Sequence, residues 1–290
     1  MSFVMQCSSY AYSTTCLLHF HPIRPTFLSL HSNYHSKRFN TAPRNHRIII
    51  SAAFHDPSSN LHSEIKRRKV VEHVCLVKAK EDLSEEEEND MLDYLYTTQY
   101  QMGGVVATSL GRVSSPNPEY YTHALYMRFQ GKENLEKFYE NSFYLKVLKE
   151  HVMTYCHGLI NVDYESEVED DMLSIFRKGE EFNCGVEFVL LISFNEGALD
   201  NLVEHALDSL ASLVLGFPSL IVQFTQGLNF SPSSKEYTHG VVIRFRSVEA
   251  FEIFILSKEY KDVWLYKFQP IVRKSLSLHF SVDPVGNKIM

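Results

Sequence analysis

Two histidines in the first half of the chain are the side chains best suited to chemistry. His73 lies within an apolar run, and His123 ends a Tyr-Thr-His triplet at the start of another. If these runs are neighbouring strands, side-chain alternation places both imidazoles on one face of the sheet, in one pocket. There they could bind a polar group or act as acid and base, or each could be a hydrogen-bonded core histidine.

A metal or cofactor site is not expected beside these histidines. No third side chain stands at a spacing that suits zinc, and the five cysteines are widely spaced, without a C-x-x-C pair. The chain has no glycine-rich phosphate loop, no G-x-S-x-G elbow and no H-E-x-x-H motif. We therefore expect neither a metal nor a cofactor.

The segments that carry the histidines occur twice in the chain. The Tyr-Thr-His triplet at 121–123 recurs 116 residues later, at 237–239. At this offset, 13 of the 37 positions from 111 to 147 are identical, whereas chance would give about two. The sequence therefore predicts a duplicated domain.

Each copy is expected to contain four strands and intervening helices. Hydrophobic patterning predicts strands at 70–78, 105–113, 120–129 and 159–164 in the first copy, and at 185–194, 220–230, 237–245 and 275–282 in the second. A capping box of Ser84 and Glu87 begins the first helix, and Ser142, Ser247 and Ser257 are expected caps of later helices. The order β-α-β-β-α-β is the ferredoxin-like pattern, in the α+β class.

Short motifs in this order resemble a known family. They are Val71-Glu72-His73-Val74, Gly111, Tyr121-Thr122-His123 with Arg128-Phe129, and Val162-Asp163-Tyr164. Together they resemble the stress-response A/B barrel domain, also called the dimeric α/β barrel, over about 70–165 and 184–283. The resemblance implies that the two copies pair through their sheets as an intramolecular dimeric α/β barrel. The chain would then be a monomeric pseudo-dimer.

Alternation along the third strand assigns a face to each side chain. Tyr121, His123 and the apolar residues that alternate with them are expected to lie beneath the helices. Arg128 and the residues that share its face of the strand are expected to pack against the partner sheet. The candidate pocket residues are His73, Tyr121, His123, Phe138 and Tyr144 in the first copy and Phe188, Tyr237, His239, Phe254 and Tyr260 in the second. Among these candidates the first copy has two histidines and the second has His239 alone, so the pockets are expected to be chemically unequal.

The resemblance also raises the possibility of cyclase chemistry. A few members are polyketide cyclases that use a tyrosine and a histidine, and these positions fall on Phe138 and Tyr144, and on Phe254 and Tyr260 in the second copy. Phenylalanine cannot exchange protons and tyrosine is a poor base at neutral pH, so this mechanism is not expected. Tyr139 would point about 100° away from Phe138 on a helix and is expected to be a weak substitute.

The N-terminal composition predicts an organelle address. Residues 1–52 contain five Lys or Arg and no Asp or Glu, and Ile50-Ser51-Ala52-Ala53 resembles a chloroplast processing site. We expect import into the chloroplast stroma, with the mitochondrion as the alternative. The expected order is a transit peptide at 1–52, a basic lead-in at 53–68, domain 1 at 69–165, an acidic linker with a short docked helix at 166–182, domain 2 at 183–283 and a tail at 284–290.

Charge and hydropathy limit the partners. Beyond residue 52 there are 23 basic and 35 acidic residues, and so acidic a body is a poor match for nucleic acid. The longest apolar stretches fall short of the roughly 20 residues that cross a bilayer, so no membrane span is expected. We expect a stress-associated protein that is non-enzymatic or binds a small hydrophobic ligand. The alternatives are an enzyme acting on a small aromatic or polyketide-like carbonyl compound through His73 and His123, and a scaffold with filled pockets.

Overall fold

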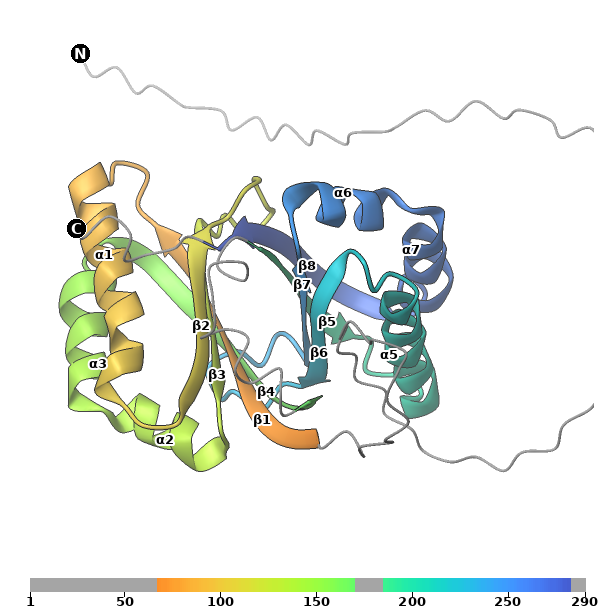
Figure 1. The fold of residues 1–290 in the computed structure, drawn as a ribbon, viewed down its shortest axis with the longest axis horizontal. Coiled ribbons are helices and arrows are strands. Elements are labelled where there is room, and N and C mark those ends of the chain that lie inside the picture. The colour runs from red at the N-terminus through yellow and green to blue at the C-terminus, as the bar shows by residue number, and fades with distance from the viewer. Residues whose placement is uncertain (1–66, 170–184, 283–290) are drawn as a thin grey trace, which may run out of the picture. The chain divides into compact units, whose positions relative to one another are not determined.

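The computed structural model describes residues 67–169 and 185–282, and each stretch forms one antiparallel sheet of four strands (Figure 1). The strand orders are β2-β3-β1-β4 and β6-β7-β5-β8, which confirms the ferredoxin-like topology. The strands are β1 (Arg67–Ala79), β2 (Val105–Arg112), β3 (His123–Phe129), β4 (Cys156–Glu169), β5 (Val186–Phe194), β6 (Ile221–Leu228), β7 (His239–Phe245) and β8 (Val272–Ser281).

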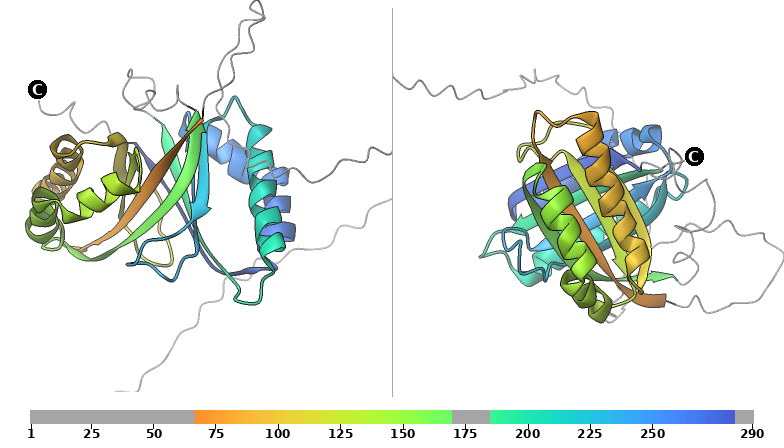
Figure 2. Two further views of the ribbon diagram at one scale, coloured as in Figure 1. Left: turned by 90° about the horizontal axis from the view of Figure 1, so that it is seen from below. Right: turned by 90° about the vertical axis from the view of Figure 1, so that its left-hand side faces the viewer.

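Helices cover one face of each sheet (Figures 1 and 2). They are α1 (Glu85–Thr97), α2 (Lys132–Glu140) and α3 (Ser142–Val147) in the first half, and α5 (Asp200–Leu215), α6 (Val248–Leu256) and α7 (Lys258–Val263) in the second. A short 3₁₀ helix, η1 (Thr98–Gln101), follows α1. π-helical turns, η2 (Leu148–Val152) and η4 (Trp264–Phe268), extend α3 and α7.

The first helix begins where the sequence predicts. The Ser84 hydroxyl accepts a hydrogen bond from the Glu87 amide at 3.2 Å, and the Glu87 carboxylate accepts one from the Ser84 amide at 2.9 Å. Four glutamates fill the first turn, where the helix dipole favours negative charge. The predicted capping box is confirmed.

The predicted alternation along β3 holds within the strand and fails before it. Leu125, Met127 and Phe129 pack beneath the helices, whereas Tyr126 faces the other sheet. Tyr121 was expected beneath the helices, and that prediction is wrong, as it is for its counterpart Tyr237. β3 begins only at His123, and the chain turns before it, so the strand alternation does not extend to these tyrosines.

The two sheets pack face to face through an inter-sheet cluster of apolar side chains from both halves. Its buried members are Val74, Leu76, Tyr121, Ala124, Tyr126, Val162, Tyr164, Val189, Leu191, Tyr237, Val242, Leu276, Leu278 and Phe280. The sheet edges also meet, because Val113 forms an antiparallel bridge to Phe280 and Tyr164 forms one to Asn229. The intramolecular pairing implied by the tandem repeat is therefore present.

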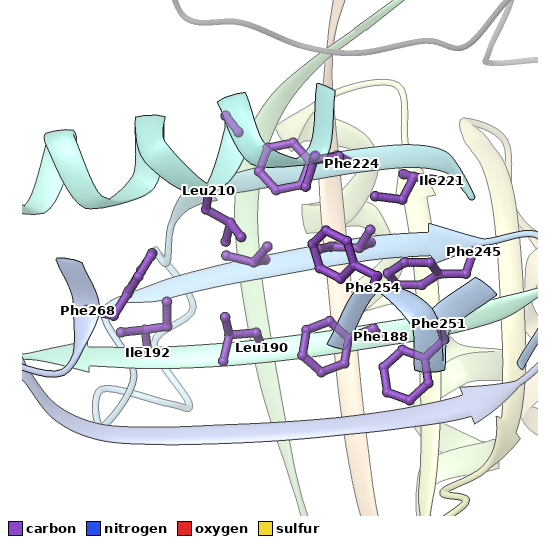
Figure 3. Close-up of a cluster of buried hydrophobic side chains, with 14 of the residues drawn as sticks. Phe188, Leu190, Ile192, Leu210, Ile221, Phe224, Phe245, Phe251, Phe254 and Phe268 are labelled. Atoms are coloured by element: carbon purple, nitrogen blue, oxygen red, sulfur yellow. The ribbon is translucent and has the colours of Figure 1, made fainter. Parts of the chain in front are cut away.

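Each half has its own core between its sheet and its helices. In the second half this core is almost entirely aliphatic and aromatic, as Figure 3 shows for Phe188, Leu210, Phe251 and Phe254. In the first half the corresponding core includes Cys75, Met91, Phe129, Phe138 and Tyr144. The candidate site residues lie within or beside these two layers.

The predicted start of the linker is wrong, and several predictions lie outside the described residues. β4 continues to Glu169, into the segment predicted as a linker from 166, because Arg67–Val70 extend β1 and pair with it. The predicted transit peptide, the docked helix within 170–182 and the tail lie outside the described residues. No helix in the described part is long and apolar enough to cross a membrane.

Candidate functional site

His73 on β1 is hydrogen bonded to Asp163 on β4. The two residues are directly opposite in the strand register, and Nδ1 of His73 lies 2.7 Å from Oδ1 of Asp163. Their side chains are 0% and 1% exposed. An ionised carboxylate only accepts hydrogen bonds, so Nδ1 carries the shared proton and Nε2 is the ring nitrogen left for another partner.

Tyr139 on α2 completes this polar group. Its hydroxyl donates to Oδ2 of Asp163 at 2.8 Å and lies 3.3 Å from Nδ1 of His73. Tyr139 therefore belongs to the polar group around His73, and its role as a weak substitute for the cyclase tyrosine stays a prediction. The rings of Phe138 and Tyr139 both contact the imidazole, with centroids 5.5 and 5.7 Å from it. The rotation of about 100° between them carries Tyr139 towards the edge strand β4, which holds Asp163.

The second nitrogen of His73 is the unusual atom of the site. Nε2 is buried and has no hydrogen-bonding partner in the described part of the chain. Phe129, Phe138 and Tyr139 meet the imidazole edge-on, and Tyr144 packs on Phe138 with centroids 3.9 Å apart. An unpaired buried polar atom costs roughly 1–3 kcal/mol. A ligand that offered a polar group here would recover that free energy.

The electrostatics of the site favour an ionised Asp163. Burial alone would raise the pKa of its carboxyl, but the interactions with His73 and the hydrogen bonds from Ser231 and Tyr139 hold that pKa below its ordinary value. Burial raises the pKa of the Tyr139 hydroxyl, and the neighbouring Asp163 raises it further. At neutral pH the site therefore contains a carboxylate and an uncharged phenol beside the imidazole.

His123 lies elsewhere on the same sheet. It is opposite Val77 on β1, four residues beyond His73, which is about 13 Å along the strand. Its Nε2 lies 2.6 Å from Oε1 of Glu88, and its Nδ1 lies 2.9 Å from Oγ1 of Thr122. The expectation of one pocket shared by both histidines is wrong, because alternation fixes the face of a side chain and not its position along the strand.

The surroundings of His123 tie α1 to the sheet. Glu88 on α1 also forms an ion pair with Arg112 at the end of β2. Burial opposes ionisation of Glu88, but hydrogen bonds from His123 and Arg112 lower the pKa of its carboxyl. Burial likewise lowers the pKa of His123, more than Glu88 raises it. Both ring nitrogens of His123 are paired, as in a hydrogen-bonded core histidine.

The matching place in the second half lacks the histidine–aspartate pair. Phe188 and Ile255 stand where the first half has its site histidine and tyrosine, and His279 stands where it has its aspartate. Phe251 packs against Phe188, with ring centroids 5.5 Å apart (Figure 3). Its ring also lies 4.3 Å from that of His279. The prediction of two chemically unequal halves is confirmed, although the difference involves more positions than predicted.

The remaining candidates of the second half are dispersed. Phe254 and Tyr260 pack together with ring centroids 5.2 Å apart, and burial raises the pKa of Tyr260 to about 12. His239 lies beside Phe194, at 5.1 Å between centroids, and its Nδ1 is 3.0 Å from Oγ1 of Thr238. These residues do not form a second copy of the site.

Asp163 and Tyr139 are the site residues that the sequence reasoning missed. A signal for the aspartate existed, because the split βαβ topology places the last strand beside the first, on the side opposite the third. Asp163 is the one acidic residue in the predicted last strand, 159–164. Examining both strands that neighbour the strand of His73 would have identified Asp163.

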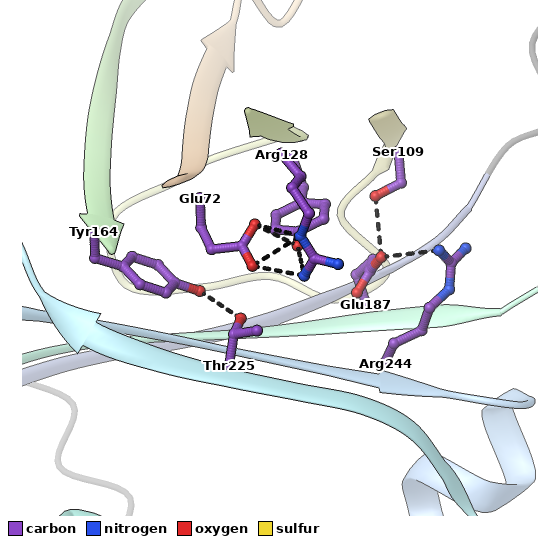
Figure 4. Close-up of polar contacts among 8 residues, drawn as sticks. Glu72, Ser109, Arg128, Tyr164, Glu187, Thr225 and Arg244 are labelled. Atoms are coloured by element: carbon purple, nitrogen blue, oxygen red, sulfur yellow. Dashed lines mark hydrogen bonds and ion pairs between the residues drawn. The ribbon is translucent and has the colours of Figure 1, made fainter. Parts of the chain in front are cut away.

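A buried charged group between the sheets was also missed (Figure 4). Glu72 accepts a hydrogen bond from Nη2 of Arg128 at 2.6 Å. Its repeat counterpart, Glu187, lies 3.4 Å from Arg244 and accepts a hydrogen bond from Ser109 at 3.1 Å. The sequence contained a signal for these ion pairs. In each copy of the domain, a glutamate in the first strand stands opposite an arginine in the third strand. Each ion pair lies within one half, on the sheet face away from the helices, and the hydrogen bond from Ser109 to Glu187 links the two halves.

Other reactive groups give no further site. Within 67–169 and 185–282, no cluster of three or more His, Cys, Asp or Glu side chains could hold a metal ion. Cys75 and Cys156 are free and buried, and burial raises the pKa of both thiols. Neither thiol is therefore activated as a nucleophile.

Known proteins resemble this chain in sequence and in fold. The family model described as Stress responsive A/B Barrel Domain matches residues 71–166 and 186–282. A stress-response A/B barrel domain-containing protein of Arabidopsis thaliana is 24% identical over 227 residues, which cover 77% of this chain and 83% of that protein.

Two solved structures share the fold at low sequence identity. An anthrone oxidase-like protein aligns with a TM-score of 0.54 and 10% identity, covering 81% of this chain and 94% of that one. A "Putative monooxygenase" from Fusobacterium nucleatum subsp. nucleatum aligns with a TM-score of 0.53 and 11% identity, covering 74% and 93%. At such identities the likeness concerns the fold alone.

Proposed function

Because the chain belongs to the stress responsive A/B barrel domain family, with two copies of the domain in tandem, we propose that its first domain binds a small aromatic molecule at His73. The molecule carries a hydroxyl group, which pairs with Nε2. One observation carries the proposal: Nε2 is buried without a partner in the described residues, while Asp163 occupies Nδ1. The second domain offers no such nitrogen at the matching place.

The chemistry of the site selects a hydroxyl donor in an aromatic frame. An imidazole that carries its proton at Nδ1 alone presents Nε2 as an acceptor, and a phenol or enol hydroxyl is the matching donor. The rings of Phe129, Phe138 and Tyr139 supply apolar contacts for an aromatic ligand. Because His73 is fully buried, such a ligand reaches it only when the overlying α2 and α3 shift.

The same arrangement favours acid–base catalysis as the second candidate function. Nε2 of His73 would take the proton of a bound hydroxyl, or of a carbon next to a carbonyl, and Asp163 would stabilise the resulting imidazolium. The observation that favours this candidate is the 2.7 Å contact between Asp163 and Nδ1. The substrate would be an aromatic or polyketide-like carbonyl compound that carries an acidic proton.

A pair of probes that differ by one hydroxyl group tests the ligand proposal. Calorimetric titration of 2-naphthol and naphthalene into the full chain should show tighter binding of 2-naphthol, by about tenfold, from one hydrogen bond to a buried nitrogen. His73→Phe gives the first half the residue of the second and should abolish this preference. His123→Gln is the control and should retain it. Equal binding of both probes by the unmodified chain would refute the proposal.

A role in the chloroplast under stress is proposed from the sequence and the family description. The family description supports the association with stress, and the acid-free composition of residues 1–52 supports import. N-terminal sequencing of the protein from plant tissue should find a start near Ala53. A mature protein that begins near Met1 would contradict the import proposal.

A further inference from the structure

The second half of the chain bonds directly to the strand segment that carries the site aspartate. The backbone amide of Phe230 donates to the carbonyl of Asp163 at 2.8 Å. The amide of Asp163 donates in return to Oδ1 of Asn229 at 3.1 Å. Both polar groups of the Asp163 backbone on the outer edge of β4 are therefore held by the loop that follows β6.

The Asn229 side chain is itself fixed by the loop. Its Oδ1 also accepts from the amide of Ser231 at 2.9 Å. Its Nδ2 donates to the carbonyls of Ser234 at 2.7 Å and Tyr237 at 2.8 Å. An asparagine amide has two donor hydrogens and an acceptor oxygen, and all are used here. The Asn229 side chain therefore connects the loop to the backbone of Asp163 in a fixed orientation.

Ser231 reaches the carboxylate of Asp163. It is buried, with 5% of its surface exposed, and its amide donates to the same Oδ1 of Asn229 that accepts from the Asp163 amide. Its hydroxyl lies 3.1 Å from Oγ of Ser233 and lowers the pKa of the Asp163 carboxyl. The neighbouring Phe230 contacts the start of α2, the helix that carries Tyr139, because Nζ of Lys132 lies 4.7 Å from the centroid of its ring. The loop at 229–231 thus touches both elements that hold the partners of His73.

The symmetry-related contact, in which the loop after β2 meets β8, lacks these side-chain contacts. There the amide of Ser114 donates to the carbonyl of His279 at 2.9 Å, so the backbone contact is repeated. Val113 stands where the other loop has Asn229, and Ser115, the counterpart of Ser231, is exposed. Valine cannot accept the hydrogen bond that asparagine accepts. The side-chain support is therefore present only beside the half that has the histidine site.

We infer that Asn229 and Ser231 of the second domain are positioning residues for the site of the first domain. They hold the Asp163 backbone and carboxylate, and Asp163 in turn fixes the proton of His73 at Nδ1. The site is then shared by the two halves, although its ligand contacts one half only. This inference rests on the proposed ligand site at Nε2 and assigns the second domain a part in it.

The test replaces Ser231 in the full chain and reads His73 with and without a probe. Ser231→Ala removes the hydroxyl that lowers the pKa of the Asp163 carboxyl, so Asp163 should titrate at a higher pH, seen in the ¹⁵N signals of His73 without ligand. The affinity for 2-naphthol should fall about threefold to tenfold, the usual effect of one hydrogen bond. Ser231→Thr keeps the hydroxyl and should restore both readouts, and Ser115→Ala, the matched control, should change neither.

The two readouts separate this inference from the proposed function. If 2-naphthol does not bind the unmodified chain at His73, the ligand proposal fails, and the ligand-free ¹⁵N titration still decides whether Ser231 positions Asp163. An unchanged His73 titration in Ser231→Ala would overturn the inference. So would an equal change in Ser115→Ala, because the effect would then not come from the loop at 229–231.

Discussion

At the scale of single residues, Asp163 determines which nitrogen of His73 a ligand can use. The carboxylate lies on Nδ1 and also accepts from Tyr139, so it orients the imidazole and fixes its proton. In the second half Phe188 replaces the imidazole and leaves His279 without such a partner on the neighbouring strand. The difference between the halves is therefore a difference in proton chemistry rather than in fold.

Replacing Asp163 with Asn tests the role of the carboxylate. The asparagine amide can donate to Nδ1, which would move the imidazole proton of His73 to Nε2 and turn that nitrogen from an acceptor into a donor. We expect Asp163→Asn to weaken 2-naphthol binding about tenfold and to leave naphthalene binding unchanged. ¹⁵N shifts of His73 report the tautomer. An unchanged tautomer together with unchanged affinity would contradict the assigned role.

Acid should destabilise the fold through His239. Burial lowers its pKa to about 4, whereas the unfolded chain has an ordinary histidine value of about 6.5. Between these values the unfolded state binds more protons, so the free energy of unfolding falls as the pH is lowered from about 6.5 to 4, by up to about 3 kcal/mol. Urea unfolding of His239→Phe at both pH values should show a smaller loss. The same loss in the variant would contradict this account.

The sequence was sufficient to predict which residue types line the site. It was not sufficient to predict which of these residues contact one another. Alternation placed His73 on the helix-covered face, where Phe138 packs against it and Tyr144 packs on Phe138. Whether His73 meets His123 or Asp163 depends on strand register and on strand order. Register arises from long-range pairing, which a local pattern does not contain.

At the scale of elements, two glycines allow the sheet edges to meet. A Cβ atom on Gly111 of β2 would lie 2.3 Å from the carbonyl oxygen of Ser281, and one on Gly227 of β6 would lie 2.5 Å from that of Glu165. The obstacle in each case is backbone, which cannot rotate away. These glycines occupy equivalent positions in the two repeats. Both contacts between sheet edges therefore depend on a glycine at the same place.

A methyl group at this junction should therefore separate the edges. Gly111→Ala is expected to lower the free energy of unfolding by about 1–3 kcal/mol, the usual cost of forcing extra volume into a packed contact. Gly158→Ala on β4 is the matched control, since a Cβ there meets nothing within 4 Å, and should change stability by less than about 0.5 kcal/mol. Denaturant unfolding measures both variants. Equal stability of the two would show that the junction tolerates a side chain.

Element type was easier to predict than element ends. The capping box at Ser84 fixed the start of α1 because capping is a local interaction. The end of β4 at Glu169 was missed, since the extra residues pair with Arg67–Val70, a segment far away in the sequence. The early start predicted for β3 misplaced Tyr121 for a similar reason. Tertiary pairing, rather than local pattern, sets these limits.

At the scale of the whole molecule, the described halves pair through both apolar and charged contacts. The inter-sheet cluster draws side chains from both sheets, and Ser109 of the first half donates to Glu187 of the second. Burial raises the pKa of Glu187, although Arg244 and Ser109 oppose the rise. A lone half would expose this face to water, so pairing within one chain removes the need for a second copy.

The chain should therefore be a monomer in solution. Light scattering on the purified protein is expected to give the mass of one chain over a wide range of concentrations. A stable dimer that persists on dilution would contradict the claim that pairing within one chain is sufficient. Gly111→Ala, which strains the junction, should shift the protein towards association if the paired face becomes exposed.

The most direct test of the central claim is the ¹⁵N spectrum of the full chain with labelled histidine, recorded with and without 2-naphthol. Signals of His73 are assigned by their absence in His73→Phe. The account predicts that 2-naphthol shifts Nε2 of His73 most, that Nδ1 keeps its proton, and that naphthalene has a much smaller effect. Signals of His73 that stay unchanged on saturation with 2-naphthol, or a response confined to His239 and His279, would contradict the account.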